Sequence, residues 1–215
     1  MTLNNRIYTY ILQISRVATW IILLMGIAVR LILFIQNRDL IIDEANIARN
    51  LYERNFAELL LPLHYEQYAP PLFLWIEKAG VLLFGYGGKA LKIYPLLCGI
   101  GTLFVFRSIL KKFVHEGAIW LPMALLAFSP YLTEFSATVK QYMPDTFIVL
   151  LLLWLALEKD ILTTSKRKFL IFWGIAGIIA ICASMPSVFA LAGVGLYYTW
   201  QCIRARRKDK LWIPI

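Results

Sequence analysis

The sequence carries little charge for its length. Only 16% of its 215 residues are charged, while 60% are hydrophobic. A typical soluble domain is about 25% charged and about 45–50% apolar. The apolar excess lies in long runs rather than being spread along the chain. The composition therefore argues against a large soluble core and predicts an all-α polytopic membrane protein.

Cysteines are few, and the common catalytic and cofactor motifs are absent. Cys98, Cys182 and Cys202 lie inside apolar runs without metal-site spacing, so we interpret them as small buried hydrophobic side chains. There is no Gly-rich nucleotide loop and no HExxH, CxxC or GxSxG motif. Because the sequence also lacks a dense carboxylate cluster, we predict neither a metal nor another cofactor.

We predict six membrane spans within a single module, residues 1–215. The first apolar run is too long for a signal peptide and no small-residue cleavage site follows it, so we interpret it as a retained span. A further apolar run at 71–86 carries Glu77 and Lys78 at its middle, which is costly at bilayer depth. We expect 71–86 to be a re-entrant or interfacial helix in an outer loop, residues 37–89. The six spans are 17–35, 90–106, 117–132, 143–157, 169–185 and 187–203.

The placement of the basic residues explains the formal net charge of +9. If 71–86 does not cross and the N-terminus is cytoplasmic, most of the 22 basic residues lie in cytoplasmic segments. A crossing at 71–86 would instead put the most basic loops outside, against the positive-inside rule. We therefore interpret the charge as a topology signal that needs lipid headgroups and no nucleic acid. The cytoplasmic segments are 1–16, 107–116, 158–168 and 204–210.

The first predicted span contains one charged residue, Arg30. An arginine one or two turns from the interface usually snorkels out to the headgroups, and this is the interpretation we favour. Phosphate binding is the alternative.

The outer loop opens with Asp43-Glu44 and ends in an aromatic, polar turn at 64–71. Between 45 and 60, apolar residues recur at helical spacing, which is typical of an amphipathic helix on a membrane surface. Asp43 stands at the N-terminus of that helix. It is either a helix cap or a catalytic carboxylate just outside the membrane.

A second polar segment, residues 129–145, lies on the same outer side in this topology. Pro144 suits the first turn of the following helix. The Asp145 carboxylate in the same turn interacts favourably with the helix dipole. Lys140 is either a solvated loop charge or part of a site. Carboxylates, a lysine and tyrosines gathered at one membrane face favour a functional site.

These residue types suit transfer from a lipid-linked donor, since cytosolic nucleotide sugars do not reach an outer face. Such a reaction needs a base for an acceptor hydroxyl and cations for a leaving phosphate. Asp43 or Glu44 is the candidate base. The candidate substrate-binding residues are the cations Lys78 and Lys140, the rings of Tyr65, Tyr68 and Tyr142, and Gln67, Gln141 and Asp145.

The order of these motifs resembles the membrane glycosyltransferases of the C superfamily, which include protein O-mannosyltransferases and aminoarabinose–lipid A transferases. The resemblance covers most of the chain. It implies a bacterial inner-membrane enzyme with its active-site loop outside, Asp43 as general base and a polyprenyl-phosphate sugar as donor. It also implies in-line attack with inversion at the anomeric carbon. The motifs are Asp43-Glu44-Ala45, Pro70-Pro71-Leu72, Phe84-Gly85, residues 90–95, Ser129-Pro130-Tyr131, Lys140-Gln141-Tyr142 and Asp145.

The chain departs from that family at three positions. Ala69 and Asn46 stand where relatives often carry a lysine and an arginine, and Lys92 stands where an arginine is usual. Phosphate binding is therefore assigned to Lys140 and Lys78. Relatives also have more spans, and residues 211–215 look like the start of a seventh. We therefore expect a complete glycosyltransferase or the N-terminal part of one, and in the second case a fragment, a truncated reading frame or one half of a split enzyme. The acceptor is a lipid, a glycan or a protein.

Two other classes of membrane protein fit part of this arrangement of spans and charges. A transporter or flippase for a lipid-linked or anionic substrate also uses intramembrane charges and a re-entrant helix. It should place ionisable groups near the bilayer midplane, where this sequence offers only Arg30. An inert membrane scaffold would leave Asp43 as a helix cap and the lysines solvated.

Overall fold

The computed structural model describes residues 3–206, and every regular element in that range is a helix. The all-α prediction is therefore confirmed for these residues. The predicted start of a seventh span at 211–215 lies outside them. In chain order the elements are α1 (Leu3–Gln36), α2 (Ile42–Glu53), η1 (Glu58–Leu60), α3 (Pro71–Phe84), α4 (Gly88–Phe113), η2 (Glu116–Ala118), α5 (Trp120–Ala127), α6 (Pro130–Phe135), α7 (Tyr142–Glu158), α8 (Lys166–Ala183) and α9 (Ser187–Arg204).

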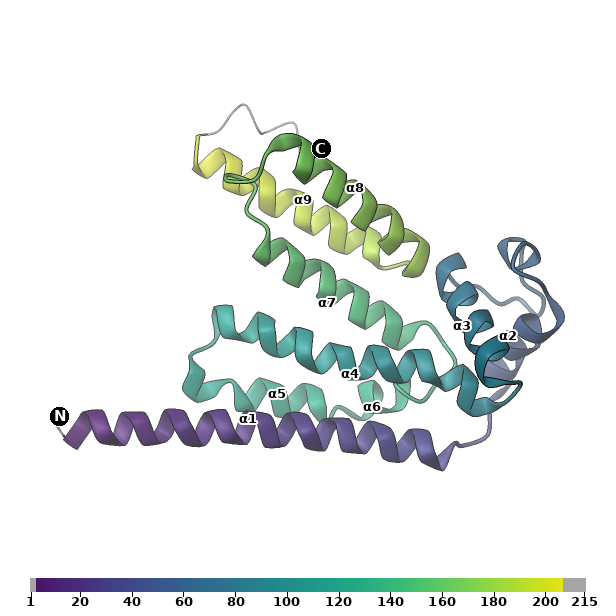
Figure 1. Cartoon of the computed structure of the whole chain (residues 1–215), viewed down its shortest axis with the longest axis horizontal. Coiled ribbons are helices and arrows are strands. Elements are labelled where there is room, and N and C mark those ends of the chain that lie inside the picture. Colours follow the sequence, from purple (N-terminus) through teal and green to yellow (C-terminus); the bar gives the residue numbers. More distant parts are fainter. Residues whose placement is uncertain (1–2, 207–215) are drawn as a thin grey trace.

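The long helices run back and forth between two ends of a bundle (Figure 1). α1, α4 and α5 pack side by side, and α7 joins α4 to the pair α8 and α9. One end carries the start of α1, the α4–η2 and α7–α8 links and the end of α9, and we call it the basic end. The other carries α2, α3 and the α8–α9 turn, and we call it the loop end.

Two helices are long and apolar enough to cross a membrane, judged by length and composition in the part of the chain described. They are Tyr8–Gln36, within α1, and Gly88–Phe113, which is α4. The other predicted spans form shorter or more polar helices, of 17 residues in α7 and 18 each in α8 and α9. The structure thus supports two of the six predicted spans.

The predicted span 117–132 is broken. α5 has eight residues, which is about 12 Å of helix, and a separate α6 begins at Pro130. Pro130 has no backbone N–H and disfavours the helical conformation at Ser129. The Ser129 hydroxyl instead accepts a hydrogen bond from the Leu132 amide and begins the new helix. The run 117–132 is mostly apolar, so hydropathy alone did not reveal this break.

The predicted amphipathic helix ends earlier than expected, and its apolar face is covered. α2 ends at Glu53, and Ile47 and Leu51 are fully buried against α3. This face is therefore not free to lie on a membrane surface, and the prediction that it does so was wrong. α3 begins at Pro71, as the Pro-Pro turn suggests, and its 14 residues give about 21 Å of helix.

Arg30 does not snorkel. Its side chain is fully buried between α1 and α5, where Nη1 donates to the carbonyls of Gly26 and Ala127 at 2.9 and 3.0 Å. Its Nε and Nη2 have no partner among residues 3–206. The prediction failed because α1 and α5 approach closely here. A Cβ added at Gly26 would lie 3.0 Å from the Cβ of Ala127.

Candidate functional site

Glu44, rather than Asp43, closes the N-terminus of α2. Its Oε2 accepts a hydrogen bond from the Ile41 amide at 3.0 Å and pairs with Arg38 at 2.6 Å. Its Oε1 accepts from the Val139 amide at 2.6 Å, and the side chain is fully buried. Both oxygens therefore hold the start of α2 against the segment before α7. This is a positioning role, in place of the catalytic role that we predicted for Glu44.

Asp43 takes no part in closing the N-terminus of α2. Its side chain is 62% exposed, and its Oδ2 lies 4.0 Å from Nζ of Lys140. No hydrogen bond to its carboxylate occurs within the described residues, so the helix-cap interpretation of Asp43 fails. An exposed carboxylate beside an ammonium has the chemistry required of a general base, which must be ionised and within reach of an acceptor.

Lys140 is largely buried beside Asp43. Its Nζ donates a hydrogen bond of 2.7 Å to Oε1 of Gln67, and only 10% of the side chain is exposed. Burial lowers the pKa of Lys140, and the carboxylates of Asp43 and Glu44 oppose that shift. The Lys140 side chain is thus not a solvated loop charge, which was one of the two alternatives for it. It is a fixed cation at the site.

The turn that supplies Gln67 has an unusual backbone. Tyr65 and Glu66 have φ angles of +62° and +52°, a left-handed conformation that costs a non-glycine residue about 1–3 kcal/mol. Asn50 of α2 holds the turn, because its Oδ1 accepts from the His64 amide at 2.9 Å and its Nδ2 donates to the His64 carbonyl at 3.2 Å. The result is that Gln67 is held beside Lys140.

The aromatic candidates divide into two groups. Tyr68 is 77% exposed, and its carbonyl accepts a hydrogen bond of 3.3 Å from Nε2 of Gln141, so it lies at the rim of the site. Tyr65 lies under the guanidinium of Arg49, 4.9 Å from the ring centroid. Tyr142 instead packs on Phe135, with ring centroids 4.9 Å apart.

Two predicted residues lie away from this group. Lys78 is buried in the α2–α3 interface, where its Nζ donates to the Leu51 carbonyl at 2.7 Å. The last carbonyls of a helix have no intrahelical donor, so a buried lysine satisfies one there. Lys78 is therefore unavailable to a phosphate, contrary to our prediction. Asp145 lines a separate cavity of about 420 Å³, together with Leu126 and Pro186.

The structure adds residues that the sequence analysis did not select. Nη2 of Arg38 donates to the Thr138 hydroxyl at 3.1 Å while Nη1 pairs with Glu44, so Arg38 ties both halves of the site together. Lys92 is fully buried and donates to the Arg38 carbonyl. A signal was available for Arg38, because the positive-inside rule leaves few basic residues outside. Asn50 was also detectable, as a polar residue beside the apolar positions of α2.

Comparison with known proteins adds no assignment, since no protein-family model, no curated protein and no solved structure matches the chain. Across residues 3–206, no three or more His, Cys, Asp or Glu side chains are grouped so as to hold a metal ion. The candidate site is therefore defined by its own geometry. Its members are Asp43, Lys140, Gln67, Gln141 and Tyr68, held in place by Arg38, Glu44 and Asn50.

Proposed function

We propose that the chain is a glycosyltransferase, or the N-terminal part of one, that uses a polyprenyl-phosphate sugar as donor. The acceptor is a hydroxyl at the outer face of a bacterial inner membrane. One observation carries the proposal: the exposed Asp43 carboxylate lies 4.0 Å from the buried Lys140 ammonium, at one end of an apolar helical bundle. The residue order described above as resembling the C superfamily supports the same reaction.

In the proposed reaction, Asp43 removes the proton from the acceptor hydroxyl. The acceptor oxygen forms a bond to the anomeric carbon from the side opposite the phosphate, so the configuration inverts. The bond between that carbon and the phosphate oxygen breaks, and its electron pair leaves with the polyprenyl phosphate. A positioned general base contributes about 10²–10⁴-fold to such a rate.

Lys140 is the cation of the proposed site, since Lys78 is committed to α2. Its ammonium is held by Gln67 and lies beside Asp43. A fixed positive charge stabilises the negative charge that develops on a leaving phosphate, and it does so more strongly in a buried position than in water.

A cavity of about 370 Å³ between α1 and α6 suits the donor lipid. Leu33, Pro130 and Ala137 form its apolar wall, and Arg38 and Glu134 also line it. Small-ligand sites are commonly about 300–1,000 Å³ and mostly apolar with a few polar groups. Arg38 also pairs with Glu44, so this cavity adjoins the residues that hold Asp43.

We further propose the six-span topology, with the N-terminus cytoplasmic and the loop end outside. The α4–η2 and α7–α8 links lie at one end of the bundle, and α2, which contains Asp43, lies at the other (Figure 1). The lateral surface carries large exposed apolar side chains, among them Leu125, Ile178 and Leu196 at 68–73% exposure. An apolar surface of this kind fits lipid. In this topology α5 and α6 together form one broken span, which is tolerated where neighbouring helices cover the break.

Transport of a lipid-linked substrate remains the second candidate, and two buried groups favour it. Arg30 leaves two nitrogens without a partner inside the bundle, and both carboxylate oxygens of Glu77 are buried and unpartnered within the described range. Burial raises the pKa of Glu77 well above its usual range. Buried ionisable groups of this kind occur along transport pathways.

One assay separates the two functions. Membranes containing the chain are loaded with a radiolabelled polyprenyl-phosphate sugar, and label is followed in lipid and acceptor fractions. The proposal expects label to leave the lipid for an acceptor, with the anomeric configuration inverted. A transporter would leave the label on the lipid and expose it to a membrane-impermeant reagent on the other side. Label that stays on the lipid would contradict the proposed reaction.

A further inference from the structure

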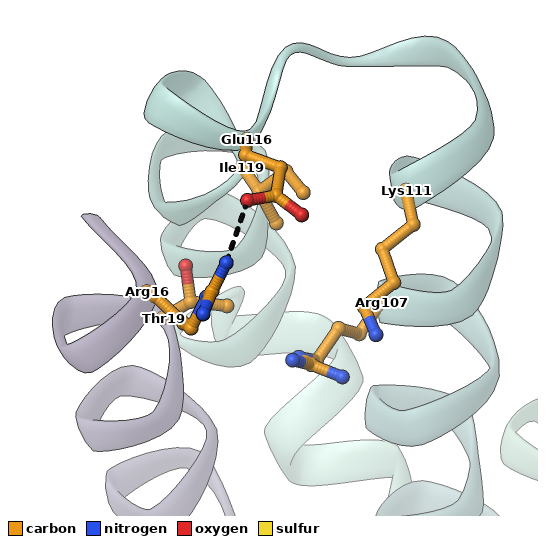
Figure 2. A pocket seen from close by; sticks show the side chains of 6 residues that line it. All are labelled: Arg16, Thr19, Arg107, Lys111, Glu116 and Ile119. Carbon is orange, nitrogen blue, oxygen red and sulfur yellow. Dashed lines mark hydrogen bonds and ion pairs between the residues drawn. The ribbon is translucent and has the colours of Figure 1, made fainter. Parts of the chain in front are cut away.

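A second charged cavity lies at the basic end of the bundle, far along α1 and α4 from the candidate active site. Its volume is about 270 Å³. Arg16 comes from α1, and Arg107 and Lys111 come from successive turns of α4. Figure 2 shows the Arg107 and Lys111 side chains on one side of the opening and the Arg16–Glu116 pair on the other.

The walls of this cavity are fixed before any ligand binds. The Ser15 hydroxyl donates to the Glu116 carbonyl at 2.7 Å, and Tyr8 bonds the His115 ring at 2.8 Å, so the α4–α5 link is tied to α1. The guanidinium carbon of Arg107 lies 4.2 Å from the Trp20 ring centroid. Stacking on an aromatic ring orients an arginine and leaves its N–H edge for a partner.

The cavity has more positive charge than its single acid neutralises. Glu116 pairs with Arg16 at 3.0 Å, and no carboxylate pairs with Arg107 or Lys111 among residues 3–206. The Nε of Arg107 is buried without a hydrogen-bond partner in the same range. Three cations around one carboxylate leave an unfilled place for an anion.

We propose that this cavity binds a phosphate group, through charge-assisted hydrogen bonds from Arg107, Lys111 and Arg16. The planar fork of an arginine matches two phosphate oxygens, and a lysine adds a point charge. The group belongs either to an anionic lipid headgroup or to free phosphate. Trp20 lies one turn after Arg16 on α1, is exposed, and stacks on Arg107, so it offers an apolar surface for an acyl chain beside the cavity. The lipid source rests on the topology proposed above, in which this end faces the anionic cytoplasmic leaflet.

The test measures binding to the purified full chain in detergent. Phosphatidylglycerol and phosphatidylcholine are compared by native mass spectrometry, and inorganic phosphate is added as competitor. The pocket variant is Arg107→Gln with Lys111→Gln. The matched control is Lys166→Gln with Lys168→Gln, which removes the same charge from exposed positions on α8 at the same end of the bundle.

We expect the pocket variant to weaken phosphatidylglycerol binding about tenfold, the factor that corresponds to about 1.4 kcal/mol, and the control to change it less than about twofold. Competition by inorganic phosphate at concentrations that fill the site would identify free phosphate as the ligand. Resistance to that competition would identify the lipid headgroup.

Equal losses in the pocket variant and the control would overturn the proposal, since they would reflect net charge alone. So would equal binding of the zwitterionic and anionic lipids together with no binding of inorganic phosphate. If the double variant fails to fold, Lys111→Gln alone replaces it, because the Lys111 side chain is exposed and makes no hydrogen bond or ion pair within the described part of the chain. The readout is binding, so it is independent of whether the chain transfers sugar.

Discussion

Two adjacent carboxylates occupy opposite environments. Glu44 is buried with both oxygens occupied, while Asp43 is exposed and close to a single cation. α2 turns successive residues about 100° apart, so one carboxylate points into the protein and the next points out. The same helical turn thus separates the group that builds the site from the group proposed to do the chemistry.

Replacing Glu44 tests this separation. Glu44→Ala leaves the buried amide of Val139 and the partly buried Arg38 without their acceptor, so we expect the free energy of unfolding to fall by about 2–5 kcal/mol. Thermal unfolding in detergent measures the loss. Glu53→Ala, which breaks an exposed pair with Arg49, is the control and should cost less than about 1 kcal/mol. An unchanged unfolding temperature in Glu44→Ala would contradict the positioning role.

The pH dependence of transfer tests Lys140. The folded protein has a Lys140 pKa below the ordinary 10.5, so the ammonium is lost at a lower pH than in a free lysine. Transfer that needs this cation should therefore decline on the alkaline side at a pH below 10.5. Lys140→Arg keeps the charge and should move the decline to higher pH. The exposed Lys89→Arg should leave the profile unchanged, and the same decline in both variants would exclude Lys140 as its source.

For single residues, the sequence predicted which segments meet but did not predict the partners and burial of each side chain. Asp43, Gln67, Lys140 and Gln141 were selected because they lie in two polar segments that the predicted topology places on the same outer face. The structure brings these residues together. Spacing could not tell Asp43 from Glu44, because the partner of Glu44 is an amide 95 residues away. The burial of Lys78 likewise depends on how α3 packs against α2.

At the scale of helices, the apolar runs predicted where helices occur better than they predicted whether each helix is continuous. The short turn between α8 and α9 and the start of α7 before Pro144 follow the sequence signals closely. The interruption between α5 and α6 does not, because hydropathy reports burial and not backbone geometry. The covered face of α2 was also beyond prediction, since an amphipathic pattern looks the same whether a membrane or another helix covers it.

The contact of α1 with α5 depends on Gly26. A larger side chain there would meet Ala127, so Gly26→Leu should separate the helices and displace Arg30 from its carbonyl partners. We expect a loss of about 1–3 kcal/mol in the free energy of unfolding. Gly174→Leu is the matched control, because a Cβ there meets nothing within 4 Å. Equal stability of the two variants in thermal unfolding would show that the close approach is not needed.

For the whole molecule, the proposed function depends on which end of the bundle faces which side of the membrane. A cysteine introduced by Glu58→Cys at the loop end should react with a membrane-impermeant maleimide in intact cells. One introduced by Thr163→Cys in the α7–α8 link should react only after permeabilisation. Cys182 is exposed, contrary to our interpretation of it as buried, whereas Cys98 and Cys202 are buried. Background labelling of Cys182 is removed by Cys182→Ser. The reverse labelling pattern would contradict the proposed orientation.

The most direct measurement compares Asp43→Asn with Asp39→Asn in the lipid-linked sugar transfer assay, at equal protein levels. Both changes remove an exposed carboxylate from the same loop, but only Asp43 lies beside Lys140. We predict that Asp43→Asn lowers transfer by about 10²-fold or more, while transfer by Asp39→Asn stays near that of the unaltered chain. Equal transfer from Asp43→Asn and the unaltered chain would show that the Asp43 carboxylate is not the base.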